Sequence, residues 1–491
     1  MARPTNIGRY AVTQMSDFLL QYEKIDPATF AVLSSFLTVS LFFKFSRFWS
    51  VRNMDILLLV LFAPGLLLIE QGEFQQAQAE QSLLTSPLIN HDEEGEQAAG
   101  VSAESEQEAL EQIPDYVSGR NKEFYGFILL WTVGGVFLIR LLLDPTMVRR
   151  PLLEPNLTSG GLLFISFSLF ALMSANVVFA GQAYQERIDL SGPLVAKVEA
   201  VGEEEKALDP GFAPLEQFAS IPVRYWLTGR GDPGRATLTM DYRFLAAVAV
   251  AGHLLIVLGM IATGYWHFNN IRMGIGAGTL YLMLPYTFQM TGQVDHVIPG
   301  VLLVWAIVLY RRPLLAGVLL GLSLCIYYPL FLLPLWVSFY WRRGLFRYLV
   351  GLLIGWGVLA ALLLVQTDNA AEWMVQLRRL FGIIVPRMEG LEGIWSLGWD
   401  PVFRIPVLVT FIAMIGTMAL WPPQKNLGTL LCCSAAVMVA TRFWSGSGGG
   451  LNMAWYLPLI LLTIVRPNLE DRTARNVVVS GWPRRRATTF G

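Results

Sequence analysis

The stretch from Gly292 to Arg343 reads GQVDHVIPGVLLVWAIVLYRRPLLAGVLLGLSLCIYYPLFLLPLWVSFYWRR. Long apolar runs alternate in it with short basic turns at Arg311–Arg312 and Arg342–Arg343. Successive apolar runs of this kind are typical of helices that cross the roughly 30 Å of hydrocarbon in a bilayer. Basic residues in short turns collect on the cytoplasmic side. The stretch therefore predicts a bundle of membrane-spanning helices.

The rest of the chain has the same character. Hydrophobic residues make up 54% of its 491 residues and charged residues only 15%. Apolar segments recur along the sequence and predict about thirteen membrane crossings. They fall near 28–43, 54–70, 124–143, 160–181, 243–264, 273–290, 297–310, 314–327, 329–341, 347–365, 405–421, 427–441 and 454–466. We expect an all-α, polytopic integral membrane protein, with the helix count left open where Pro329 follows Tyr328.

Several functional classes are disfavoured by composition. The three cysteines, Cys325, Cys432 and Cys433, all lie in apolar segments and predict no disulfide framework. Basic clusters are short and adjacent to the membrane, so nucleic acid is not an expected partner. The first residues have no continuous apolar core before a small-residue cleavage site, so we expect no cleaved signal peptide.

Orientation follows from the basic residues in short loops. Alternating crossings put nearly all of them on one side: Lys44, Arg47, Arg52, Arg149, Arg150, Arg272, Arg311, Arg312, Arg342, Arg343, Arg347, Lys425 and Arg484–Arg486. We expect this side to be the cytoplasm, with the C-terminus there and the long loops 71–123, 182–242, 366–404 and 442–453 on the other side. The location predicted is the cell (inner) membrane.

Composition also suggests three parts. Residues 1–157 form an N-terminal accessory membrane module, 158–466 the transmembrane core and 467–491 a basic cytoplasmic tail. Within the module, the acidic outer loop 71–123 has no Lys or Arg between Glu70 and Arg120 and is rich in Gln, Ala, Ser and Glu. Such a segment buries too little apolar surface to order itself, which predicts a disordered tether. The alternative, a cation-binding patch, lacks the carboxylate spacing of a calcium loop.

The order in which polar, small and proline residues interrupt the stretch from Gly292 to Arg343 is informative. A Gly-Gln pair stands at an outer helix mouth, basic turns follow on the inner side, and small residues and prolines interrupt the apolar helices: Gly292–Gln293, Arg311–Arg312–Pro313, Ala316–Gly317, Gly321, Tyr328–Pro329 and Arg342–Arg343. This arrangement resembles the middle of the GT-C membrane glycosyltransferases, especially their polyprenol-dependent mannosyltransferase-like branch. Family members often carry a Lys just before the proline, whereas this chain has Tyr327 and Tyr328.

The resemblance implies a GT-C-like core and sugar transfer on the non-cytoplasmic face, from a polyprenyl-phosphate-linked donor to an acceptor. Such a reaction needs a carboxylate that takes the proton of the acceptor hydroxyl. The family carries a crucial acid in an early outer loop, a description that Asp189 fits best. Asp115 is the alternative, although an acid at a helix N-terminus is also favoured by the helix dipole, as at Asp241 and Asp295.

Three polar residues stand together at the outer mouth of the seventh apolar segment: Gln293, Asp295 and His296. We expect them to bind substrate, for example through hydrogen bonds to sugar hydroxyls or phosphate. The plainer interpretation of His296 is an interfacial histidine satisfied by water. No cofactor is identified. A divalent metal stays open, because consecutive Asp295 and His296 need further ligands that the sequence does not reveal.

The loop 366–404 carries arginines on the side that is otherwise poor in them. Apolar residues recur there at helical spacing, which predicts a segment lying on the outer membrane surface. Arg378, Arg379 and Arg387 are candidate ligands for the phosphate of a lipid-linked sugar donor, because a guanidinium binds phosphate in a bidentate manner. Attraction to anionic membrane lipids explains the same residues without a substrate.

Two other functions compete with the enzyme. A transporter or lipid-handling permease predicts ionisable residues deep in several helices, and His253 is the one clear candidate. A non-catalytic polytopic component of envelope assembly is the other alternative. The departure at Tyr327 is compatible with it.

Overall fold

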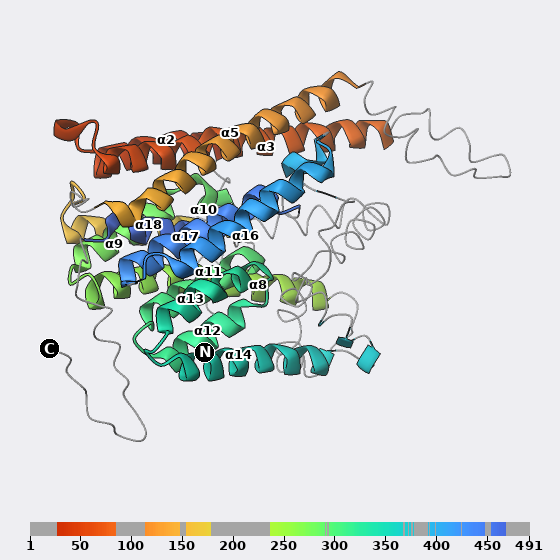
Figure 1. Cartoon of the computed structure of the whole chain (residues 1–491). Coiled ribbons are helices and arrows are strands. Elements are labelled where there is room, and N and C mark those ends of the chain that lie inside the picture. The colour runs from red at the N-terminus through yellow and green to blue at the C-terminus, as the bar shows by residue number, and fades with distance from the viewer. Residues whose placement is uncertain are drawn as a thin grey trace, which may run out of the picture.

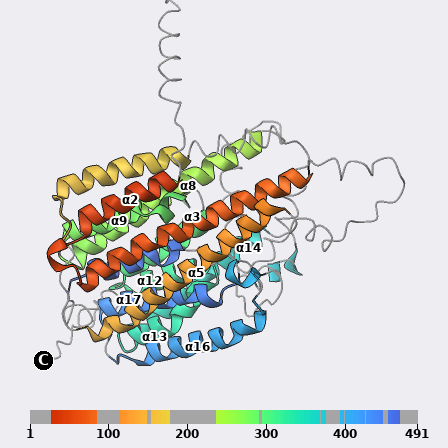
Figure 2. The ribbon, with the colours of Figure 1, turned by 90° about the horizontal axis from the view of Figure 1, so that it is seen from above.

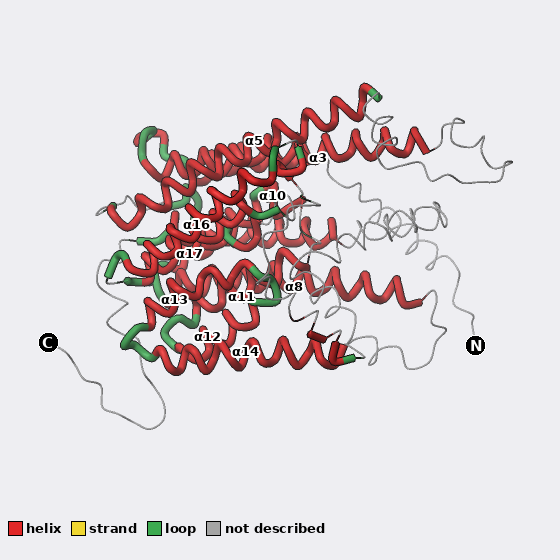
Figure 3. Tube along the Cα trace, turned by 45° about the vertical axis from the view of Figure 1, so that its right-hand side comes forward, coloured by secondary structure: helices red, strands yellow, loops and turns green. Residues whose placement is uncertain are grey.

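The computed structural model describes residues 27–84, 113–147, 154–177, 236–289, 291, 294–366, 369–371, 373–374, 377, 391, 393–397, 399–423, 425–446 and 453–467. Every regular element in these ranges is a helix, which confirms the predicted all-α class (Figure 1). Short loops join helices that lie side by side, as the green segments of Figure 3 show. The described part is a helical bundle.

The α-helices are α2 (Pro27–Phe42), α3 (Val51–Leu84), α5 (Pro114–Leu143), α8 (Ala236–Trp266), α9 (Ile271–Met283), α10 (Pro285–Gln289), α11 (Val294–Val308), α12 (Pro313–Ser323), α13 (Leu333–Tyr340), α14 (Leu345–Gln366), α16 (Arg404–Leu420), α17 (Leu427–Trp444) and α18 (Leu457–Val465). One more helix covers Ser159–Val177. Short 3₁₀ segments are η1 (Phe45–Arg47), η3 (Asp144–Thr146), η4 (Tyr328–Leu332), η5 (Gly393–Ser396), η6 (Pro401–Phe403) and η8 (Met453–Trp455).

Seven of the described helices are long and apolar enough to cross a membrane: Val51–Gln76, Pro114–Thr146, Ser159–Val177, Ala246–Trp266, Leu345–Leu364, Pro401–Leu420 and Leu427–Trp444. Four more apolar helices are shorter. The prediction of a multi-pass membrane protein is confirmed at this level, whereas the count of about thirteen crossings stays a prediction.

Burial separates central helices from peripheral ones. The apolar stretch of α17, Leu427–Trp444, is 94% buried inside the protein. The stretch that includes α16, Pro401–Leu420, is only 22% buried. The outward side of α16 carries large apolar side chains such as Val409 and Leu420, as expected for a lipid-facing helix. Ser159–Val177 is also peripheral and lies beside α2 and α9 (Figure 2), held to α9 by a hydrogen bond between the hydroxyls of Ser166 and Thr279. The core therefore centres on α17.

The bundle has two ends, which we name by their contents. The tail end is the one where α18 finishes, and it lies at the left in Figure 1. The turns that precede α3, α9, α12, α14 and α17 lie there too. The mouth end is the opposite one, where α11 begins and α17 finishes.

A buried ion network ties the tail end together. Arg140 of α5 binds both carboxylate oxygens of Asp55 on α3, at 2.8 and 2.9 Å, and also Asp144 at 2.6 Å. Arg466, just after α18, binds the other oxygen of Asp144. Arg52 donates to two carbonyls at the C-terminal end of α18. Both aspartates are 1% exposed, so these pairs are inside the protein.

Other tail-end cations are held by neutral groups. Lys425 donates to the hydroxyl of Ser338 and to two carbonyls near the end of α16, each at 3.0 Å. Burial lowers the pKa of Lys425. The pKa of His267 is lowered for the same reason, although its Nε2 contacts the carbonyl of Val308. These contacts join helix ends that are distant in sequence.

The N-terminal and C-terminal helices share one hydrophobic core. Phe62 of α3 and Phe137 of α5 stack at 5.6 Å and belong to the same cluster of buried side chains as Tyr456, directly before α18, and Leu461 of α18. The two parts of the chain that the sequence separates near residue 157 are therefore packed against each other. The division into an accessory module and a core stays a prediction.

The helices α12 and α13 form a short hairpin. At 1.5 Å per residue, the 11 residues of α12 span about 16 Å, and η4 with α13 spans about 22 Å. Both lengths are well below the 30 Å of a hydrocarbon core. The tip of the hairpin, with Tyr327 and Tyr328, therefore lies inside the bundle. Residues 314–327 and 329–341, which the sequence suggests as two crossings, are these two arms.

The packing of α12 against α14 generates a test with an internal control. A Cβ at Gly355 would lie 2.3 Å from the carbonyl oxygen of Val318, whereas a Cβ at Gly357 meets nothing within 4 Å. We expect Gly355→Ala to force the helices apart and cost about 1–3 kcal/mol. Gly357→Ala should be neutral or stabilising, because alanine favours helix. Thermal unfolding of the purified protein in detergent measures both, and equal unfolding temperatures would contradict this packing.

The ion network generates a second test. Asp144→Asn leaves Arg140 and Arg466 without a shared counter-charge, and breaking a buried pair costs about 3–5 kcal/mol. We expect a large fall in unfolding temperature. Glu154→Gln, an exposed position, is the control and should change little. If Asp144→Asn is as stable as this control, the network does not hold the tail end.

Candidate functional site

Several short elements come together at the mouth end. The hairpin tip, the ends of α10 and α17, the beginnings of α11 and α16, and η8 meet there. We call the polar and aromatic residues that they bring together the mouth-end cluster: Tyr286, His296, Tyr328, Arg404, Arg442, Trp444, Ser445, Trp455 and Tyr456. All nine are buried.

His296 is in the first turn of α11 and is only 7% exposed. Its Nδ1 is 2.8 Å from the hydroxyl of Tyr286 on α10. Its ring makes an edge contact with Trp455, with centroids 6.3 Å apart. The histidine that the sequence singles out is therefore held by two neighbouring aromatic residues.

Tyr328 connects the hairpin tip to the C-terminal helices. Its hydroxyl makes a short hydrogen bond with Ser445, directly after α17. Its ring lies 5.1 Å from Trp455 and 6.0 Å from Trp444. The position where the GT-C resemblance weakens is thus occupied by an aromatic residue at the centre of the cluster.

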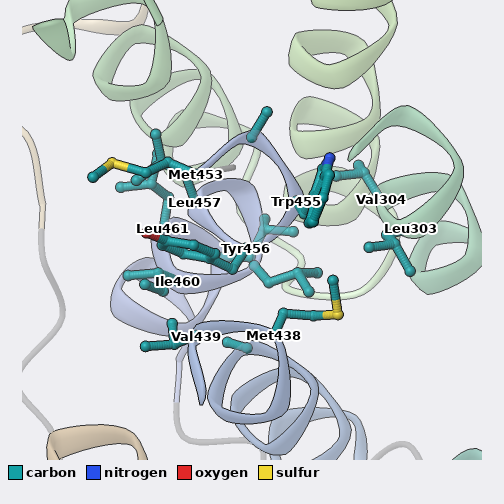
Figure 4. Packing of buried hydrophobic residues seen from close by; sticks show 14 of the residues in the cluster. Leu303, Val304, Met438, Val439, Met453, Trp455, Tyr456, Leu457, Ile460 and Leu461 are labelled. Atoms are coloured by element: carbon teal, nitrogen blue, oxygen red, sulfur yellow. The ribbon is translucent and has the colours of Figure 1, made fainter. Parts of the chain in front are cut away.

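Figure 4 shows that the side chains of Trp455, the last residue of η8, and of Tyr456, the next residue, point to different sides. Trp455 lies beside Val304 of α11, whereas Tyr456 points away from α11. Because α18 begins at Leu457, directly after this pair, the start of one helix supplies rings to two sides of the site.

Two arginines in the cluster are 4% exposed. Arg404, at the start of α16, donates from Nε and Nη2 to the carbonyl of Trp444, at 3.0 and 2.9 Å. Arg442, near the end of α17, donates from Nη1 to the hydroxyl of Tyr456 at 2.8 Å. The carbonyl and the phenol hydroxyl are neutral groups, in contrast to the aspartates of the tail end.

Hydropathy did not single out Arg442. The residue directly follows the apolar segment 427–441, where a basic residue is ordinarily interpreted as a helix-end charge. The helix continues to Trp444 and turns this side chain into the protein. The sequence did offer one signal for a buried arginine: Arg442 directly follows a fully apolar segment and has no acidic residue nearby in sequence.

His253 belongs to α8, outside the mouth-end cluster, and is 2% exposed. Its Nε2 is 3.2 Å from the carbonyl of Thr291, which can only accept, so Nε2 carries the proton. Its Nδ1, 2.9 Å from the hydroxyl of Tyr281, accepts from that residue. Both nitrogens of a neutral imidazole are thereby used to pack helices.

Most residues predicted from the sequence to act on substrate lie outside the described residues. These are Asp189, Gln293, Arg378, Arg379 and Arg387. For Asp295 only the backbone is described, in the first turn of α11. His296 is thus the one predicted substrate-binding residue whose side chain is placed.

The alternative acid, Asp115, lies outside the cluster. It is exposed in the first turn of α5, after Pro114, where the helix dipole favours an acid. The contact of Arg442 with this helix is near Gly134, nineteen residues on, which is about 28 Å along the axis. Asp115 therefore lies well apart from Arg442 along α5, and its role as the alternative acid stays a prediction.

A separate pocket of about 420 Å³ lies close to Asp115. Its lining combines aromatic, amide and guanidinium groups of α5 with one residue after η5: Tyr116, Val117, Arg120, Asn121, Phe124 and Leu397. Because no cluster residue lines it, this pocket and the mouth-end cluster are different features.

In the described ranges, no three His, Cys, Asp or Glu side chains are grouped so as to hold a metal ion. No family model matches the chain, and neither a curated protein nor a solved structure matches it. Function has therefore to be inferred from the residues and geometry of this chain.

Proposed function

We propose that the chain is a membrane glycosyltransferase with a GT-C-like core, which moves a sugar from a polyprenyl-phosphate-linked donor to an acceptor on the non-cytoplasmic face. One observation carries the proposal: at one end of the bundle two buried arginines are bonded to aromatic residues, Arg404 to the carbonyl of Trp444 and Arg442 to the hydroxyl of Tyr456. Guanidinium groups bind phosphate, and aromatic rings pack against the apolar faces of sugars.

The chemistry assigned to the site is a single displacement. The acceptor hydroxyl attacks the anomeric carbon as a carboxylate takes its proton, and the bond from that carbon to the phosphate oxygen breaks. The oxygen and the bonding electrons leave with the polyprenyl phosphate. Asp189 is the proposed base and Asp115 the alternative. No step is assigned to a metal.

Binding roles are divided between the sugar and the phosphate. Gln293, Asp295 and His296 are proposed to contact sugar hydroxyls, which suits the position of His296 in the mouth-end cluster. Arg378, Arg379 and Arg387 are proposed to attract the donor phosphate at headgroup depth. A multi-pass arrangement with the mouth end away from the cytoplasm completes the proposal.

Sugar transfer tests the proposal directly. Full-length protein in liposomes is supplied with radiolabelled polyprenyl-phosphate mannose or glucose and with membrane extract as acceptor. We expect transfer by the wild type and a fall of about 100-fold or more for Asp189→Asn, because the general base is lost. His296→Ala should reduce transfer less severely.

Glu154→Gln is the matched control, an exposed acid at the tail end that should leave transfer unchanged. Absence of transfer from either donor would reject these two substrates. Equal rates for wild type and Asp189→Asn would reject the catalytic assignment.

The proposed orientation has its own test. Ser105→Cys places a thiol in the acidic loop 71–123, and Thr488→Cys places one in the basic tail. In intact cells, a maleimide that cannot cross membranes should label the first variant only, because basic segments stay in the cytoplasm. The native cysteines are buried and give the background. Labelling of Thr488→Cys alone would invert the topology.

A further inference from the structure

The guanidinium of Arg442 lies between four helices. Its Nη1 donates to Tyr456, next to α18, and its Cζ lies 5.9 Å from the ring centroid of Phe62 on α3. On α5 it lies near Gly134, where an added Cβ would lie 3.3 Å from Nη1. The side chain is 4% exposed. An arginine of α17 is thus enclosed by α3, α5 and α18.

One edge of this guanidinium is buried without a partner among the described residues. Nε and Nη2 of Arg442 have no hydrogen-bond partner in the part of the chain that the structure describes. These two nitrogens face the same way and form the fork that binds two oxygens of an oxyanion side by side. The hydrogen bond of Arg442 to Tyr456 uses the remaining nitrogen, Nη1, so it leaves the fork unoccupied.

The protein fills the same fork in two other buried arginines. Nε and Nη2 of Arg140 bind the two carboxylate oxygens of Asp55, at 2.8 and 2.9 Å. Nε and Nη2 of Arg404 both donate to the carbonyl of Trp444. Arg442 therefore differs from its neighbours of the same type, whose forks are satisfied within the chain.

The local environment does not neutralise the charge. Arg442 forms no ion pair with a carboxylate in the described ranges. A phenol hydrogen bond and a cation–π contact offset only part of the cost of burying a full charge. Within a membrane-spanning helix, an ionisable residue without a counter-charge is a functional candidate. An anion in the fork would supply the missing charge and both missing acceptors.

We infer that the Nε/Nη2 fork of Arg442 is a subsite for a phosphate oxyanion. The inference rests on the proposed function for its biological source, the phosphate of a polyprenyl-phosphate substrate or product. Tyr456, whose hydroxyl accepts from Arg442, directly follows Trp455 in the chain, so the backbone connects the subsite to the aromatic part of the mouth-end cluster. Inorganic phosphate offers the same chemistry.

Binding, without any transfer reaction, tests the inference. Purified full-length protein in detergent is titrated with polyprenyl phosphate, with inorganic phosphate and with the uncharged polyprenol, and affinity is measured by calorimetry. We expect polyprenyl phosphate to bind at least tenfold more tightly than polyprenol. Arg442→Lys keeps the charge but loses the fork, and it should remove most of this difference.

Arg47→Lys is the matched control, because Arg47 is exposed at the tail end. Its affinity for polyprenyl phosphate should equal that of the wild type. Binding of inorganic phosphate with the same dependence on Arg442 would also support the subsite and identify free phosphate as a source. The inference is overturned if Arg442→Lys binds both phosphates as the wild type does, or if the wild type binds neither better than polyprenol.

A second variant separates a binding role from a structural one. Arg442→Met removes the buried charge, so without phosphate it should unfold at the same temperature as the wild type or above it. Polyprenyl phosphate should raise the unfolding temperature of the wild type but not of Arg442→Met. A large loss of stability in phosphate-free Arg442→Met would show a structural cation and overturn the inference. Phosphate binding without sugar transfer would overturn the proposed function alone.

Discussion

Arg140 is the centre of a buried ion network that joins helix ends distant in sequence. Its guanidinium reaches Asp55 at the start of α3 and Asp144 after α5, and Asp144 in turn binds Arg466 after α18. Charges without partners are expensive at this burial, so the three helix ends have few alternative registers. Once α3, α5 and α18 are fixed at the tail end, the side chains that they present further along are fixed as well. Phe62, Gly134 and Tyr456 around Arg442 depend on that register.

The two ends of the bundle use buried cations differently. At the tail end, Arg140 and Arg466 are matched with aspartates, and Lys425 is bound by a hydroxyl and helix carbonyls. At the mouth end, Arg404 contacts a carbonyl and Arg442 a phenol. A cation that is paired within the chain stabilises structure and is not available to a ligand. A buried cation with unpartnered N–H groups can instead gain its counter-charge on binding.

Hydropathy predicts which segments become helices, but it does not predict where they bend. The segments near 54–70, 243–264 and 347–365 all lie within long helices, because their apolar length alone decides the structure. The segment near 273–290 is divided between α9 and α10, since Pro285 begins a new helix after an extended residue.

The candidate site likewise has one part that the sequence predicts and another that it does not. His296 was identifiable from sequence because it stands in a polar group at a helix mouth. Arg442 was not, because its significance depends on which atoms of its guanidinium remain without partners. That property is set by α3, α5 and α18, which pack around it from distant parts of the chain. Spacing along one helix carries no information about such partners.

Helix length explains why polar chemistry gathers at the mouth end. The 9 residues of α18 span about 14 Å, whereas the 34 residues of α3 span about 51 Å. Helices as short as α18 and the α12–α13 hairpin cannot extend from the tail end to the far membrane surface. Their mouth-side ends expose backbone groups at a depth where lipid offers no hydrogen bonds, so protein or water has to surround them. The long helices can shield this region from lipid, and the same shielding keeps the charged and aromatic side chains of the mouth-end cluster inside the protein.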